Sequence, residues 1–131
     1  MKFDQIMEKV EIINEPQLIH ESLIYHINDE EEIKYVNRHK HWRRNGKRHR
    51  TDGPAVEYSD GGKCWYLNGK RHRTDGPAVE CSDGYKSWYL NGKRHREDGP
   101  ASEYSDGSKS WFLNDKNYSE KEFNEEVKNE I

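Results

Sequence analysis

The side chains best suited to chemistry in this sequence recur at an interval of 23 residues. Histidines stand at His49, His72 and His95, each inside the segment Lys-Arg-His-Arg. A histidine ring can bind a metal ion or carry a proton near neutral pH. If the repeats form stacked hairpins, equivalent histidines lie roughly 9–10 Å apart, whereas zinc holds each ligand nitrogen at about 2.0–2.1 Å. We therefore expect no shared metal site and no cofactor.

Catalysis by these histidines would need a nucleophile or a paired acid in a cleft. The same residues recur in all three repeats, which indicates that they have a structural role. We expect each histidine to face its tryptophan across a strand pair, as His72 faces Trp65. We expect no catalytic residue and no enzymatic activity.

The arginines of the same segments form a second candidate site. Alternation along a strand would place both arginines of a segment on one charged face, beside a tyrosine. Stacked repeats then build a cationic ridge whose tyrosine rings can stack on nucleobases or guanidinium groups. A phosphate backbone would bind such a ridge in a salt-sensitive manner. The predicted binding face consists of Arg43, Arg44, Arg48, Arg50, Tyr66, Arg71, Arg73, Tyr89, Arg94 and Arg96.

Neighbouring carboxylates compete for these arginines. Glu57 and its counterparts in the later repeats fall on the same predicted face, and an aspartate follows each segment closely. The net charge falls from +3 over residues 42–64 to +1 over 65–87 and to zero over 88–110. Nucleic acid or anionic lipid is therefore expected to bind weakly, and most strongly at the first repeat. The acidic run at 29–32 is interpreted as a solvated linker, the alternative being that it folds over the first repeat and masks it.

Turn signals divide each repeat into two β-hairpins. Asn68-Gly69 and Asp60-Gly61 are dipeptides that accept positive φ angles at both centres of a type I′ turn. Two-residue turns at these sites fix the register, with Tyr66 opposite Arg71 and Val56 opposite Trp65. The predicted core face then holds Val56, Tyr58, Trp65, Leu67 and His72, and the predicted polar face holds Glu57, Cys64, Tyr66, Arg71 and Arg73.

The predicted fold is mainly β, an antiparallel meander of tandem β-hairpin repeats over residues 33–115. We expect an N-terminal cap of helical or mixed structure at 1–32 and a capping helix at 116–131. Residues 18–27 fit a strand or a helix equally well. Helical spacing in the N-terminal cap is shown by Phe3, Ile6, Met7, Val10 and Ile13.

The C-terminal helix has a clear start signal. Ser119 as N-cap and Glu122 three residues later make a capping box, and Tyr118 and Phe123 occupy the positions of a hydrophobic staple. Phe123, Val127 and Ile131 continue as an apolar stripe at helical spacing. This amphipathic pattern predicts a helix that covers the open end of the sheet.

The chain shows no targeting or membrane signal. No run approaches the roughly 18 apolar residues of a membrane helix, and charged residues interrupt the start before an apolar segment of a signal peptide forms. Cys64 and Cys81 occupy different positions of the repeat, whereas a disulfide framework would recur with it. We expect free thiols in a reducing cytoplasm, that of the host cell if the chain is viral.

The pattern N-G-K-R-H, followed by D-G and then by E-Y-S-D-G-x-K-x-W, resembles the MORN repeat over residues 33–115. The variant H-R-x-D-G-P-A is similar to repeats in bacteriophage and giant-virus proteins. The resemblance implies a hairpin scaffold and a module that binds partners or membranes. We expect a non-enzymatic module for protein–protein interaction, with a phage-encoded inhibitor of a host or defence protein as one context. The alternative is nucleic-acid or anionic-lipid binding, and open sheet edges would allow a homodimer.

Overall fold

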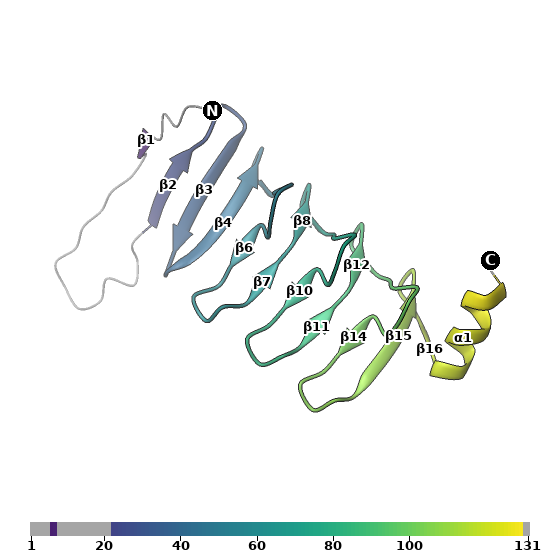
Figure 1. The fold of residues 1–131 in the computed structure, drawn as a ribbon. Helices are drawn as coiled ribbons and strands as arrows, with labels where there is room; N and C mark the ends of the chain where they lie inside the picture. The colour runs from purple at the N-terminus through teal and green to yellow at the C-terminus, as the bar shows by residue number, and fades with distance from the viewer. Residues whose placement is uncertain (1–5, 8–21, 130–131) are drawn as a thin grey trace.

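In the computed structural model, which describes residues 6–7 and 22–129, the chain is a long row of antiparallel strands with one helix at its C-terminal end (Figure 1). The main sheet has the order β1-β2-β3-β4-β6-β7-β10-β11-β14-β15-β16, and β5 pairs with β4 beside this path. Two further hairpins, β8–β9 and β12–β13, each form a separate two-stranded sheet. This arrangement confirms a mainly β antiparallel meander.

The strands within the repeats are short, and most contribute only two residues to the ladder. The N-terminal strands are β1 (Ile6–Met7), β2 (Ser22–His26), β3 (Glu31–Val36), β4 (His39–Arg44) and β5 (Lys47–Arg48). The central strands are β6 (Val56–Glu57), β7 (Lys63–Cys64), β8 (Tyr66–Leu67), β9 (Lys70–Arg71), β10 (Val79–Glu80), β11 (Lys86–Ser87), β12 (Tyr89–Leu90) and β13 (Lys93–Arg94). The last elements are β14 (Ser102–Glu103), β15 (Lys109–Leu113), β16 (Lys116–Tyr118) and α1 (Glu120–Asn129).

The Asn-Gly turns have the predicted geometry. Asn68 and Gly69 both have positive φ, at 50° and 84°, and the flanking pair is Tyr66 opposite Arg71. Positive φ at both central residues is the requirement of a type I′ turn, which asparagine and glycine meet most easily. The same turn recurs at Asn45-Gly46, Asn91-Gly92, Asn114-Asp115 and Asn37-Arg38.

The Asp60-Gly61 loop differs from the prediction by one residue. Val56 pairs with Cys64, and the Tyr58 amide donates to the Gly62 carbonyl at 2.8 Å. Within this loop only Gly61 has a positive φ, of 97°. The reason is that Oδ1 of Asp60 accepts the Gly62 amide at 2.9 Å, which stabilises a three-residue loop instead of the predicted two-residue turn.

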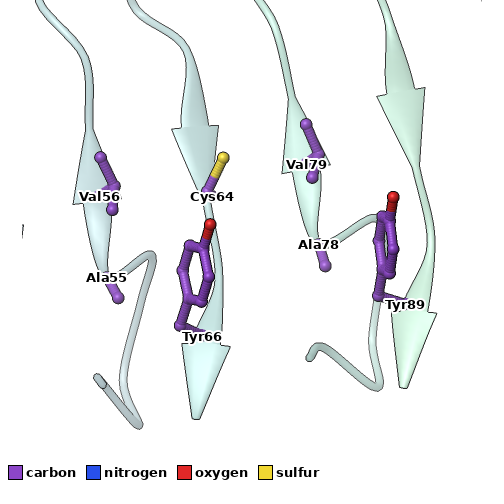
Figure 2. Close-up of a cluster of buried hydrophobic side chains, with 7 residues drawn as sticks. All are labelled: Ala55, Val56, Cys64, Tyr66, Ala78, Val79 and Tyr89. Carbon is purple, nitrogen blue, oxygen red and sulfur yellow. The ribbon is translucent and has the colours of Figure 1, made fainter. Parts of the chain in front are cut away.

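This slip of one residue overturns the predicted sorting of side chains between the two faces. Val56 and Cys64 lie on one face, and Trp65 lies on the other. Tyr66, expected on the polar face, is only 8% exposed, and Tyr89 is 9% exposed. The buried cluster shown in Figure 2 consists of Ala55, Val56, Cys64, Tyr66, Ala78, Val79 and Tyr89.

The N-terminal segment extends the sheet. Ile6–Met7 form β1 and pair with Tyr25 and His26 of β2, so the helix expected there is wrong at these two residues. Phe3, Val10 and Ile13 lie outside the described residues. The strand interpretation of 18–27 is confirmed over Ser22–His26, because β2 pairs with β3 along its whole length.

The C-terminal helix begins as predicted. The Ser119 amide donates to Oε1 of Glu122 at 2.9 Å, and the Glu122 amide donates to Oγ of Ser119 at 3.1 Å. These reciprocal bonds are the capping box. Phe123 is buried, and α1 packs against β15 and β16. The described part of the chain contains no helix long and apolar enough to cross a membrane.

Candidate binding surface

The two arginines of each segment have different environments, and Arg73 represents the first kind. Its guanidinium carbon lies 3.8 Å from the centre of the Trp65 ring. Nε donates to Oδ1 of Asp75 at 2.9 Å, and Nη1 donates to the Pro77 carbonyl and to Oε2 of Glu80, each at 3.0 Å. Cation–π stacking and charge-assisted hydrogen bonds together fix this side chain in one orientation.

The same contacts recur at Arg50 and Arg96, which lie 3.7 Å and 3.9 Å from the rings of their tryptophans. The glycine of each D-G-P segment makes room for the guanidinium, since a Cβ on Gly53 would lie 2.9 Å from Cζ of Arg50. Arg50, Arg73 and Arg96 are called here the tryptophan-face arginines. Their donors are largely used inside the repeat, which explains the motif R-x-D-G-P structurally.

The second kind of arginine lies on the face of the buried tyrosines. Arg71 pairs with Tyr66 across the hairpin, and its guanidinium carbon lies 5.3 Å from the centre of the Tyr89 ring. Arg48 has the same relation to Tyr66, and Nη1 of Arg48 lies 3.4 Å from the Tyr66 hydroxyl. Nε of Arg94 donates to the Tyr89 hydroxyl at 3.1 Å. Arg48, Arg71 and Arg94 are called here the tyrosine-face arginines.

The predicted single ridge is therefore wrong, because the two arginines of each segment lie on opposite faces. Alternation would hold them together only if the strand continued, but β9 ends at Arg71, and the Arg73 amide donates to the Tyr89 carbonyl of the next hairpin. Within the described residues, no carboxylate oxygen lies within salt-bridge distance of Arg48, Arg71 or Arg94. Each tryptophan-face arginine, by contrast, contacts both an aspartate and a glutamate.

The tyrosine-face arginines also perturb their aromatic neighbours. Burial alone would raise the pKa of Tyr89, but the hydrogen bond from Arg94 and the charges of Arg94 and Arg71 outweigh it and lower that pKa. The hydrogen bond to Tyr89 raises the pKa of Arg94 against the effect of its burial. The tyrosine-face arginines thus contact the hydroxyl groups of Tyr66 and Tyr89, two members of the buried cluster of Figure 2.

Three further tyrosines belong to this face, and the sequence prediction missed the exposure of Tyr58 and Tyr104. Tyr58, expected in the core, is 36% exposed, and Tyr104 is 37% exposed. The Tyr85 and Tyr104 rings lie 5.3 Å apart beside a hollow of about 400 Å³. Their place next to the Asp-Gly loops is the sequence signal for this exposure, because side chains at the end of a hairpin have fewer neighbours. The tyrosine face is defined here by Arg48, Arg71, Arg94, Tyr58, Tyr66, Tyr85, Tyr89 and Tyr104.

Arg43 and Arg44 of the first repeat lie opposite the acidic run. Glu32 pairs with Arg43 and Glu31 with Arg44 across β3 and β4. Nη1 of Arg43 lies 3.8 Å from the Glu32 carboxylate, and Nη2 of Arg44 lies 3.5 Å from that of Glu30. The linker interpretation of this run is wrong for its last two residues, which are part of a strand, and the run partly offsets the charge of the first repeat.

The histidine column connects successive repeats. Nδ1 of His49, His72 and His95 accepts the backbone amide of Asn68, Asn91 and Asn114, respectively, at 2.9–3.0 Å. The His72 amide also donates to the Trp65 carbonyl, which confirms the predicted cross-strand pairing. The link between repeats was not anticipated from the sequence, although its constant offset of 19 residues reaches the asparagine of the next type I′ turn each time.

The described residues contain no group of three histidine, cysteine, aspartate or glutamate side chains arranged to hold a metal ion. Cys64 is buried, Cys81 is exposed, and both are free thiols. Comparisons with protein-family models, with curated proteins and with solved structures find no match to this chain. The architecture itself, an antiparallel sheet of short repeated hairpins, is that of a β-repeat protein.

Proposed function

We propose that this protein is a non-enzymatic binding module that recognises another protein through its tyrosine face. One observation carries the proposal. The tyrosine-face arginines present one guanidinium per repeat with no carboxylate partner among the described residues, whereas each tryptophan-face arginine contacts two carboxylates. An external partner with acidic groups would supply the missing acceptors.

The composition of this face favours a protein partner. Tyrosine and arginine are enriched at protein interfaces, because both combine a large apolar contact area with hydrogen-bonding groups. The arginines are held against aromatic rings at 5.0–5.3 Å, so little side-chain entropy is lost when a partner binds them. The resemblance of the repeats to MORN units, which serve as scaffolds and binding modules, agrees with this proposal.

The proposed context follows from the same resemblance. A reducing cytoplasm suits the two free thiols. Similarity of the H-R-x-D-G-P-A variant to phage and giant-virus repeats supports an inhibitor of a host or defence protein, acting in the host cytoplasm. A homodimer through a sheet edge is a further option for the N-terminal side, since among the described strands β1 has a single neighbour, while α1 packs against β15 and β16 at the other end.

A polyanion is the second candidate ligand. The tyrosine-face arginines recur once per repeat, and such a regular spacing of cations suits the backbone of a nucleic acid or an anionic lipid surface. Aromatic rings beside them could add base stacking, but Tyr66 and Tyr89 are buried, so the exposed rings of Tyr58 and Tyr104 are better placed for it. The partial offset of Arg43 and Arg44 by the acidic run reduces the charge of the first repeat.

Two matched charge variants test the proposal. The first combines Arg48→Gln, Arg71→Gln and Arg94→Gln on the tyrosine face. The second combines Lys63→Gln, Lys86→Gln and Lys109→Gln, which removes the same charge from exposed residues on the opposite face. Wild type and both variants are immobilised and incubated with a nuclease-treated lysate of the source cells, and retained proteins are identified by mass spectrometry and then purified for direct binding measurements.

The proposal is supported if a purified protein binds wild type and the lysine variant but not the arginine variant. If both variants lose binding of the partner equally, the effect is due to net charge, and the tyrosine face is not the binding site. In parallel, fluorescence anisotropy measures DNA and RNA binding, and sedimentation measures binding to phosphatidylserine vesicles, across a salt series. Tight, salt-sensitive polyanion binding that only the arginine variant loses, together with no protein partner, would establish the second candidate instead.

A further inference from the structure

A hollow of about 380 Å³ lies where the N-terminal strands meet the first repeat. It draws basic side chains from three neighbouring strands, β3, β4 and β5. The residues that line it are Lys34, Val36, His41, Arg43, Gly46 and Arg48. Four of these six carry a basic side chain, and aspartate and glutamate are absent from the lining.

The pairing of the strands explains this convergence. Lys34 pairs with His41 across β3 and β4, and Arg43 pairs with Arg48 across β4 and β5. His41 and Arg43 are two residues apart in one strand, so they point to the same face. Opposed pairs on one face have Cβ atoms about 4.5–5.5 Å apart, and therefore all four basic groups can reach one small ligand.

The charge of the hollow is incompletely balanced within the described residues. Glu32 contacts Arg43 from the rim at 3.8 Å, which is long for an ion pair. With His41 neutral, three positive charges from Lys34, Arg43 and Arg48 stand against this one carboxylate, which leaves +2. Like charges placed together are unfavourable unless an anion joins them.

We propose that this hollow binds a tetrahedral oxyanion of the phosphate class. The guanidinium groups of Arg43 and Arg48 offer planar pairs of donors that match phosphate oxygens, and Lys34 adds a mobile positive charge. Arg43 donates one long hydrogen bond to the Gly46 carbonyl, and Arg48 donates one to the Tyr66 hydroxyl, each at 3.4 Å. Most of the five N–H donors of each guanidinium therefore stay available. The inference is independent of the protein-binding proposal, since only Arg48 belongs to both sites.

His41 gives this site a pH response. Burial lowers the pKa of His41, and the positive charges of Arg48, His39, Arg43 and Lys34 lower it further. Other titratable groups nearby include Glu32, which contacts Arg43, Tyr66, whose hydroxyl lies 3.4 Å from Arg48, and Tyr58 of the adjoining β6 hairpin, whose ring contacts His39. A bound dianion reverses the field at the ring, so the His41 pKa rises and a proton is taken up on binding. Oxyanion affinity should therefore increase as the pH falls through the range in which histidine titrates.

Sulfate is the probe that isolates this effect, because it stays a dianion between about pH 5 and 8. Isothermal titration calorimetry of the full chain at several pH values measures sulfate affinity and proton uptake. NMR of labelled histidine rings follows the His41 pKa with and without sulfate. We expect saturable binding that tightens as the pH falls, and a His41 pKa that is higher in the presence of sulfate.

Lys34→Gln removes one cation that forms no ion pair with the residues the structure describes, and we expect it to weaken sulfate binding about tenfold. Lys63→Gln is the matched control, because it removes the same charge from an exposed position on the opposite face of the sheet. Circular dichroism and thermal melting confirm that both variants fold. Weakening by the control as large as by Lys34→Gln would overturn the proposal, as would an unchanged His41 pKa or the lack of any sulfate binding at millimolar concentration.

The source of the oxyanion is resolved by three further ligands. Inorganic phosphate, phosphoserine and dimethyl phosphate present a free anion, a monoester and a diester. Tighter binding of phosphoserine assigns the site to phosphate monoesters, and tighter binding of inorganic phosphate assigns it to the free ion. Preference for dimethyl phosphate, a monoanion, over both dianions would contradict the proposed charge complementarity.

Discussion

The guanidinium group of Arg73 stacks on the Trp65 ring at 3.8 Å, on the sheet face opposite to that of Arg71. The contact includes the D-G-P segment, because Arg73 also donates to Asp75 and to the Pro77 carbonyl. Arg73, which the sequence pattern predicted to bind a ligand, therefore has a structural role in the repeat. The recognition proposed above therefore depends on Arg71 and its equivalents on the tyrosine face.

Replacing Arg73 by lysine should destabilise the fold. A lysine carries the charge but lacks the planar set of donors that contacts Asp75, Pro77 and Glu80 together. We expect a loss of about 2 kcal/mol in the free energy of unfolding, measured by urea denaturation. Arg71→Lys is the control on the opposite face, and its effect should be clearly smaller. Equal losses for the two variants would contradict the distinction between the two kinds of arginine.

Features that depend on neighbouring residues were predictable from the sequence. The Asn68-Gly69 turn was confirmed because two adjacent residues suffice to favour its φ angles. The capping box of α1 was confirmed because Ser119 and Glu122 lie within one helical turn. The meander followed from the regular recurrence of such turns between short strands.

Features that depend on competition between bonds were not predictable. The Asp60-Gly61 loop gained a residue because the Asp60 side chain accepts the Gly62 amide, and the whole face assignment moved with it. The separation of Arg71 from Arg73 depends on where β9 ends, which the sequence pattern leaves open. Hence Tyr66 was expected to be exposed and is buried instead.

Substituting Gly53 by alanine should disturb the stacked arginine rather than the backbone. The new Cβ would lie 2.9 Å from Cζ of Arg50, which is held against Trp42. We expect a loss of about 1–3 kcal/mol, as for other overpacked sites, together with a changed indole NMR shift for Trp42. Gly61→Ala is the comparison, since its φ of 97° causes strain while no atom lies within 4 Å of the new Cβ. Gly61→Ala should therefore lower the free energy of unfolding and leave the indole NMR shift of Trp42 unchanged.

The histidine link should be strongest at the first repeat. His49 is buried, and its bond to the Asn68 amide is partly shielded from water, whereas the bond from Asn91 to His72 is exposed. His49→Leu keeps the approximate volume and removes the acceptor, so we expect a loss of about 1–3 kcal/mol. His72→Leu should cost less, because water can replace the acceptor there. Hydrogen exchange at the Asn68 amide should accelerate in the His49 variant, and unchanged exchange would refute the proposed link.

The two thiols should differ sharply in reactivity. Burial raises the pKa of Cys64, and burial together with the charges of Asp83 and Asp60 raises that of Cys81. The thiolate is the reactive form, so the exposed Cys81 should react with iodoacetamide more slowly than a free peptide thiol at neutral pH, and faster as the pH rises. Cys64 should react only after unfolding. Mass spectrometry of wild type and of Cys81→Ser measures both rates, and rapid labelling of Cys64 in the native state would be inconsistent with its burial.

The start of α1 should respond to acid. The Ser119 amide donates to the Glu122 carboxylate, and this bond lowers the Glu122 pKa below its ordinary value. A carboxyl group whose folded pKa is depressed stabilises the folded state above its unfolded pKa, and this stabilisation is lost as the pH falls through the folded pKa. The first turn of α1 should therefore fray at acidic pH while the sheet persists, with the Ser119 amide resonance reporting the loss. Glu122→Gln should remove most of this acid sensitivity because its amide has no proton to gain. Glu125→Gln, at an exposed position of the same helix, should leave the sensitivity unchanged, and an equal effect of both substitutions would assign it to general charge instead of the capping box.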